Sequence, residues 1–262
     1  MSFTTLMNQV SSSACAVQIT QEWSQGRAAY GGLLAGLVYE SMNKKITDGR
    51  PVRNLQISFI GPVSFEQPLY LETEVFREGK SVTQILGRGI QSGQTQIAIM
   101  GSFGHSRASS LSVISEPRLF PEIPSELNAM PYVDGVFPEF TKFFDFRYIT
   151  KMPFQGSKDS TLRGFVRFKS SQGQIGIAQV LGLVDAWPAT ALPMLNSPAP
   201  ASSLNWTIEF IHPQPVLEAD EYCQYEAVTE HTANGYVHTR AKIWNMKGEL
   251  IAISQQTVTI FG

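Results

Sequence analysis

Charged residues and cysteine are both scarce in this sequence. Only 16% of the 262 residues are charged, and the formal net charge is −2 at neutral pH, with no basic stripe. Nucleic-acid binding depends mainly on basic side chains that neutralise phosphates, so the composition argues against a nucleic-acid-binding protein. The two cysteines, Cys15 and Cys223, lie far apart and form no CxxC pair. This pattern favours a reducing compartment.

Long apolar runs and several well-known motifs are also missing. No run approaches the roughly 20 apolar residues that span a bilayer, and the N-terminus lacks a basic region followed by an apolar stretch. We therefore expect a soluble, cytoplasmic protein without a membrane span. The absence of P-loop, GxSxG and GxGxxG patterns argues against nucleotide hydrolysis, a serine hydrolase and a Rossmann oxidoreductase. No histidine stands at metal-ligand spacing, so we expect neither a metal nor a cofactor.

What the sequence does contain is an internal repeat. The segment Asn-Leu-Gln-Ile-Ser-Phe-Ile-Gly-Pro at 54–62 returns as Asn-Trp-Thr-Ile-Glu-Phe-Ile-His-Pro at 205–213. The two copies lie more than half a chain apart, so each is a whole folding unit. The hydrophobic content of 43% lets each half bury a core. We predict an N-terminal domain at 1–108, a proline-containing linker at 109–141 and a C-terminal domain at 142–262.

Both halves show one helix followed by four strands. Apolar residues recur at helical spacing in 33–45 and 174–187, and Gly36-Leu37-Val38 matches Gly182-Leu183-Val184. Alternating strand patterns occur at 52–60, 69–77, 81–90, 95–103, 143–149, 162–168, 204–211, 222–229, 235–245 and 250–260. This order favours an α+β fold over a parallel Rossmann sheet. Because the helices are apolar nearly all round, we expect each to be wrapped by a sheet.

The order of elements resembles the hotdog fold, and the fused pair resembles the double-hotdog acyl-CoA thioesterases. The resemblance rests on Tyr30-Gly31-Gly32, on Phe76-Arg77-Glu78-Gly79-Lys80-Ser81 and on the run from 205 to 256. It covers nearly the full chain. It implies two tandem antiparallel sheets, each around a long central helix, an acyl-CoA substrate in fatty acid metabolism and a homodimer of the fused chain.

The resemblance also implies a set of site residues. Members of this family hydrolyse the thioester with a water held by an aspartate, a threonine or serine, and a glutamine. These positions fall on Asn205, Thr229 and Gln256, with Thr232 close to the second of them. An asparagine can orient water but cannot act as a general base. When the two repeats are aligned, Phe76 of the first half matches Thr229, and Ser102 matches Gln256. The implied threonine and glutamine therefore occur only in the second half, which indicates a site there.

Asp185 is a candidate for the missing acid. It is the only carboxylate inside the second predicted helix, and carboxylates are seldom buried without a partner or a function. Related single-hotdog thioesterases use an acid on this helix; the alternative is that Asp185 caps the helix end or faces solvent. Gly31 and Gly32 could present helix N-terminal amides to the thioester carbonyl, or could simply permit close packing.

Three functions fit these observations. The leading one is an acyl-CoA thioesterase with Asp185 as base. The second is a non-catalytic protein that binds acyl-CoA or an acyl chain, motivated by Asn205 at the acid position. The third is an acyl-CoA hydratase, but that chemistry usually needs an acid close to a histidine, and the sequence shows no convincing pair among its four histidines.

Overall fold

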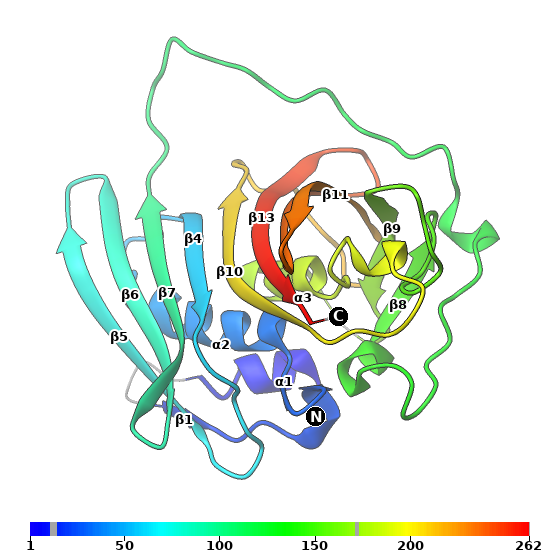
Figure 1. The fold of residues 1–262 in the computed structure, drawn as a ribbon. Coiled ribbons are helices and arrows are strands. Elements are labelled where there is room, and N and C mark those ends of the chain that lie inside the picture. Colours follow the sequence, from blue (N-terminus) through cyan, green and yellow to red (C-terminus); the bar gives the residue numbers. More distant parts are fainter. Residues whose placement is uncertain (11–14, 171–172, 262) are drawn as a thin grey trace.

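A computed structural model describes residues 1–10, 15–170 and 173–261. Its main feature is an 11-stranded sheet in the order β1-β5-β6-β7-β4-β10-β13-β12-β11-β9-β8, with antiparallel neighbours throughout (Figure 1). The first half contributes β1 (Cys15–Val17), β4 (Val52–Phe59), β5 (Leu69–Glu78), β6 (Val82–Gln91) and β7 (Gln94–Gly104). The second half contributes β8 (Phe144–Tyr148), β9 (Thr161–Phe168), β10 (Ala201–Phe210), β11 (Cys223–Ala233), β12 (Tyr236–Trp244) and β13 (Leu250–Ile260). The predicted α+β class is confirmed.

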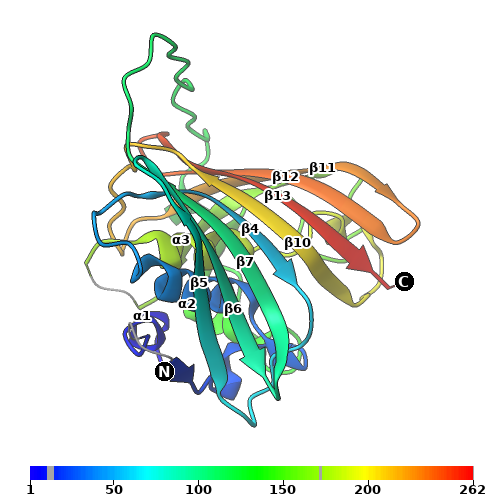
Figure 2. The same cartoon turned by 90° about the vertical axis from the view of Figure 1, so that its left-hand side faces the viewer.

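The two halves join edge to edge. Strand β4 of the first half pairs with β10 of the second from Asn54 opposite Glu209 to Ser58 opposite Asn205. The two expected sheets therefore form one continuous curved sheet (Figure 2). These are the strands that carry the internal repeat, so the repeated sequence makes the seam of the molecule. The domain boundaries remain predictions.

Two helices pack against each other on the concave side of the sheet. Helix α2 (Gly31–Asn43) begins two residues before its predicted start, and α3 (Ile177–Asp185) is shorter than predicted at both ends. Most of both helices is buried, as their continuous apolar surface predicts. Both cysteines are free and buried. No helix in the described residues is long and apolar enough to cross a membrane.

A short N-terminal helix, which the sequence patterns did not predict, packs against both α2 and α3. Helix α1 (Phe3–Met7) places the ring of Phe3 against both long helices. A Cβ atom at Gly36 of α2 or Gly182 of α3 would lie 3.1 or 2.9 Å from that ring. The glycine shared by the two repeats therefore leaves room for one aromatic ring between α2 and α3.

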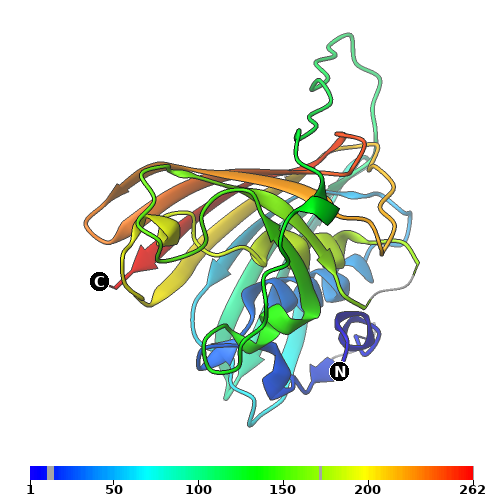
Figure 3. The ribbon, with the colours of Figure 1, turned by 90° about the vertical axis from the view of Figure 1, so that its right-hand side faces the viewer.

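The remaining elements are short and lie in the connections. They are the 3₁₀ turns η1 (Gln21–Trp23), η2 (Pro124–Glu126), η3 (Glu139–Phe143) and η4 (Leu192–Met194), and the two-residue strands β2 (Ser24–Gln25) and β3 (Ala28–Ala29). The linker arches away from the sheet and returns across its outer face (Figure 3). There Phe120 packs edge-on against Phe165 and Trp244, and its N–H donates to Gln224 Oε1. The proline-rich segment thus lies over the surface, as predicted.

Candidate active site

Asp185 lies where the C-terminal end of α3 meets the N-terminal end of α2. The Nε2 of Gln256 on β13 donates to Asp185 Oδ1 at 2.9 Å, and the backbone N–H of Gly32 donates to the same carboxylate. The first turn of a helix leaves N–H groups without helical acceptors, and they favour negative charge. One acid, one amide side chain and one helix start therefore converge on a single point.

The glycines at the start of α2 make this approach possible. A Cβ atom at Gly31 would lie 2.9 Å from Asp185 Oδ2, and one at Gly32 would lie 3.0 Å from Asp185 Cβ. The same atom at Gly32 would also collide with the hydroxyl of Tyr30, which donates to the carbonyl of Gly182. Neither glycine has a positive φ, so space rather than backbone conformation requires them.

Burial raises the pKa of Asp185 to about 7, against the opposing effect of the hydrogen bonds from Gln256 and Gly32. Desolvation disfavours the charged carboxylate, whereas the two donors favour it. A carboxyl group with a pKa near the working pH can accept a proton and release it again. Burial, together with the nearby charge of Asp185, also raises the pKa of the Tyr30 and Tyr225 hydroxyls, which therefore stay protonated.

The inner face of the second-half sheet carries a row of side chains through Gln256. Trp206 on β10 pairs with Gln256, Gln256 with Thr239 on β12, and Thr239 with Thr229 on β11. Two strand spacings separate Thr229 from Gln256, or roughly 10 Å. The Thr229 hydroxyl shares a 2.7 Å hydrogen bond with that of Thr190. Thr229 thus lies on the same face as Gln256, but its hydrogen-bond partner is in the segment after α3.

Asn205 lies on the other face of the sheet. It is exposed and stands opposite Thr257 and Ser58, whereas its neighbour Trp206 points inward with Gln256. Successive residues of a strand alternate between faces, so the Asn205 side chain points away from Asp185. The structure therefore brings Asp185, Gln256, Gly31 and Gly32 together and leaves Asn205 outside this group.

Two further features of the site were not predicted. A bulge between Ser203 and Asn205 puts Ser203 opposite Val258. Val258 is two positions after Gln256 on β13, so Ser203 lies on the same inner face as Gln256. Trp187, just after α3, stacks on Tyr225 with ring centroids 4.9 Å apart and an interplanar angle of 5°. A bulge has no clear sequence signal, whereas the sequence does show an aromatic residue two positions after Asp185.

The site contains residues of both halves. Asp185 and Gln256 come from the second half, as the differences between the repeats indicated, but Gly31 and Gly32 come from the first. The described histidines contact other groups: His105 pairs with Asp48, His212 with the Val52 carbonyl, and His231 stacks on His238. Within the same residues, no three histidine, cysteine, aspartate or glutamate side chains gather as metal ligands.

Comparisons with known proteins identify the family and the fold. A model of the acyl-CoA thioesterase N-terminal domain matches residues 19–104, and one of the C-terminal domain matches 124–260. A conserved hotdog-fold protein of unknown function from Alicyclobacillus acidocaldarius has 17% identity and a TM-score of 0.85, over 99% of this chain and 98% of its own. An acyl-CoA thioesterase II from Mycobacterium marinum has 16% identity and a TM-score of 0.78, over 100% and 99%. A search of curated proteins gave no match.

Proposed function

Because the chain belongs to the acyl-CoA thioesterase family, we propose that it hydrolyses the thioester of acyl-CoA to a free acid and coenzyme A. The observation that carries the proposal is the junction of Asp185, Gln256 and the start of α2. It combines a carboxyl group whose pKa is about 7 with a neutral amide donor and a helix end that favours negative charge. These are the parts that water attack on a carbonyl requires.

In the proposed reaction, Asp185 takes a proton from water as the water oxygen attacks the thioester carbonyl. The carbonyl oxygen gains negative charge, which the dipole of α2 and the first-turn N–H of Gly31 stabilise. Collapse of this intermediate breaks the carbon–sulfur bond. The coenzyme A thiolate leaves and takes up the proton held by Asp185, so the carboxylate is restored.

Other side chains position the water and the acyl group. Gln256 fixes the orientation of the Asp185 carboxylate through its 2.9 Å hydrogen bond. The Ser203 hydroxyl, on the same inner face as Gln256, is the proposed second contact of the water. Trp187 and Tyr225 offer a stacked aromatic wall beside the acid. Thr229 is proposed to support the segment after α3 through Thr190.

The direct test is release of free thiol from acyl-CoA thioesters of increasing chain length. We expect turnover with at least part of this series, and the chain-length profile then gives the substrate preference. Absence of thiol release from the whole series, with the folded protein verified by circular dichroism, would refute the proposal.

Nothing in the site favours the two alternative functions. The binding-protein hypothesis arose from Asn205 at the acid position, and Asn205 lies on the opposite face from Asp185. The hydratase hypothesis requires a histidine next to the acid. In the described parts of the chain, the contacts of the four histidines do not include Asp185.

Gln256 should control the pH dependence of the reaction. Its amide lowers the pKa of Asp185, so Gln256→Leu should raise that pKa above about 7. The rising limb of kcat/KM against pH should then move to higher pH, because Asp185 acts as a base only when ionised. At neutral pH we expect a loss of about tenfold, the usual scale for one hydrogen bond to a charged group.

The adjacent glutamine supplies the control for this experiment. Gln255 is exposed on the outer face, so Gln255→Leu removes the same chemical group without contact to Asp185. Its pH profile should match that of the unsubstituted protein. An unmoved profile for Gln256→Leu would show that this amide does not act on the catalytic acid.

A further inference from the structure

The indole N–H of Trp187 is buried without an acceptor. Trp187 is only 6% exposed, and within the described residues its Nε1 atom has no hydrogen-bond partner. Buried N–H groups in folded proteins are nearly always paired, so an unpaired one calls for an explanation. Trp187 lies two positions after Asp185, at the end of α3. The unpaired donor therefore stands beside the proposed catalytic acid.

The contacts of the Trp187 ring hold it in one orientation. It stacks on Tyr225, and it meets Phe146 and Tyr148 edge-on with ring centroids 5.4 and 5.1 Å apart. On β9, Gly164 leaves room for the ring, since a Cβ atom there would lie 2.6 Å from Trp187 Cη2. A ring packed on several sides cannot turn to find an acceptor. An acceptor must therefore come to the N–H.

The surroundings of this donor favour an uncharged acceptor. The rings of Phe146, Tyr148 and Tyr225 carry no charge, because burial raises the pKa of both tyrosine hydroxyls and keeps them protonated. A second anion would also be repelled by the carboxylate of Asp185. An indole N–H donates and cannot accept, so a ketone oxygen, which only accepts, is its simplest partner.

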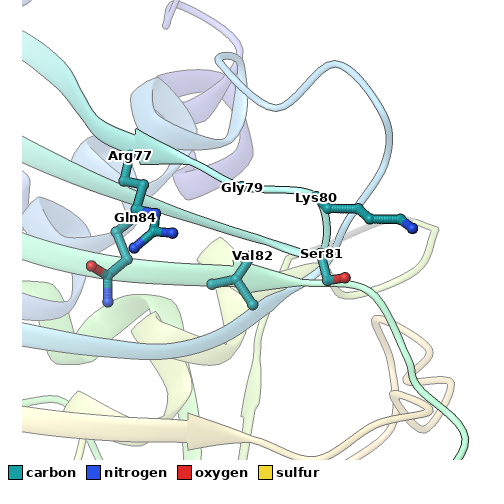
Figure 4. Close-up of a pocket in the computed structure, with 6 residues that line it drawn as sticks. All are labelled: Arg77, Gly79, Lys80, Ser81, Val82 and Gln84. Atoms are coloured by element: carbon teal, nitrogen blue, oxygen red, sulfur yellow. The ribbon is translucent and has the colours of Figure 1, made fainter.

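Polar groups at the surface are in a different situation. Figure 4 shows Arg77, Lys80 and Gln84 at a hollow of about 330 Å³ by the hairpin between β5 and β6. These three side chains are exposed, so water satisfies their donors without any ligand. The N–H of Trp187 lacks this access to water. Its unpaired state therefore carries information about a ligand that the surface hollow does not.

We propose that Trp187 determines the acyl-group specificity of this site, and that its Nε1–H donates to a ketone oxygen on the acyl chain of an oxoacyl-CoA substrate. This inference rests on the proposed thioester hydrolysis and names its substrate class. The acyl chain is the part of the substrate that suits a buried aromatic wall, whereas the phosphates of coenzyme A need water or cationic partners. A plain acyl chain leaves the N–H unpaired, and sites built to hydrogen-bond a substrate group discriminate against analogues that lack it.

Matched substrates test the specificity. Thiol release should be compared between octanoyl-CoA and the oxooctanoyl-CoA isomers that differ in the position of the ketone. We expect kcat/KM for at least one isomer to exceed that for octanoyl-CoA by about tenfold, the scale of one buried hydrogen bond. Trp187→Phe keeps an aromatic ring and removes the N–H, so the ratio should fall to about one. Because both rates are measured on one sample, the ratio does not depend on the fraction of protein that is folded.

Trp244→Phe is the matched control. Trp244 packs against Phe120 on the outer face of the sheet, away from Asp185. Removing its indole should leave the preference for the oxo isomer unchanged. An equal loss with all thioesters in Trp187→Phe would assign the N–H to the coenzyme A part that they share, and this result would overturn the proposal.

A binding measurement on the unsubstituted protein separates this proposal from thioester hydrolysis. Thioether analogues, S-octyl-CoA and its oxo isomers, cannot be hydrolysed. In nitrogen–proton correlation spectra, the Nε1–H signal of Trp187 is the one missing from Trp187→Phe. It should move downfield with the favoured oxo analogue and stay in place with S-octyl-CoA, because only the former accepts its hydrogen bond.

The outcomes for the two proposals differ. No preference for any oxo isomer, a preference that survives in Trp187→Phe, or an unmoved Nε1–H signal would each overturn the role of Trp187. Hydrolysis of octanoyl-CoA without an oxo preference would refute only this specificity. Selective binding of an oxo thioether without thiol release from any thioester would refute only the hydrolase.

Discussion

Replacing Asp185 with asparagine should lower kcat/KM for acyl-CoA hydrolysis by about 10²–10⁴-fold, the usual contribution of a positioned general base. Asparagine keeps the shape of the side chain and can still accept the hydrogen bond from Gly32, but it cannot take a proton from water. Steady-state thiol release at several substrate concentrations measures the effect. We expect the loss mainly in kcat, since Asp185 acts on the water rather than on the substrate.

The same substitution should make the protein more stable at alkaline pH. Asp185 has a pKa of about 7 when folded and about 3.9 when unfolded, so the folded state binds the proton more tightly. Its ionisation therefore costs stability progressively as the pH rises from about 4 to about 7. Asparagine removes this cost. The melting temperature of Asp185→Asn should exceed that of the unsubstituted protein at about pH 8, with a smaller difference at about pH 5.

These two measurements check each other. Unchanged hydrolysis in Asp185→Asn would eliminate Asp185 as the base. Lost hydrolysis with a lower melting temperature at about pH 8 would indicate that the substitution damages the fold, and the catalytic interpretation would then fail.

Gly32→Ala should damage both the fold and the reaction. The new methyl group would lie 3.0 Å from Asp185 Cβ and would displace the Tyr30 hydroxyl from the Gly182 carbonyl. Overpacking of this kind costs about 1–3 kcal/mol of unfolding free energy. Displacement of Asp185 from its water should lower kcat by about tenfold or more, because catalysis depends on sub-ångström placement.

Gly104→Ala is the matched control. A Cβ atom there would meet its nearest neighbours at 3.5 and 3.6 Å, which is ordinary van der Waals contact. Urea denaturation and thiol release on both variants measure the two effects. If Gly32→Ala were as stable and as active as Gly104→Ala, the close approach of α2 to Asp185 would have no functional role.

Local sequence patterns predicted most of the elements in this fold. The alternation in Leu55, Ile57 and Phe59 located β4, and the continuous apolar surface of α2 predicted its burial. Asp185 stood out because it is a single carboxylate on an apolar helix. The predictions of β4 and of the burial of α2 were confirmed because they depend on neighbours in the sequence, where the periods of strands and helices are fixed. The role of Asp185 stays a prediction.

Features that depend on distant residues were not predicted. The contact of Gly32 with Asp185 joins the two halves, and no local pattern reports it. The family resemblance placed Asn205 in the site, but the bulge before it and the alternation of β10 turn its side chain outward. Helix α1 is too short to show a period, although Phe3 fills the space between the two glycines of the repeat.

The pairing of β4 with β10 also means that β4 is synthesised long before its partner strand exists. Strand β4 is complete at Phe59, but its partner ends only at Phe210. At the usual ~5–20 residues per second, a ribosome needs about 8–30 s to make the intervening chain. Throughout that interval the β4 edge of each nascent chain is open to the same edge on a neighbouring nascent chain. On a polysome, the repeat that joins the finished halves is therefore open to mispairing until β10 has been made.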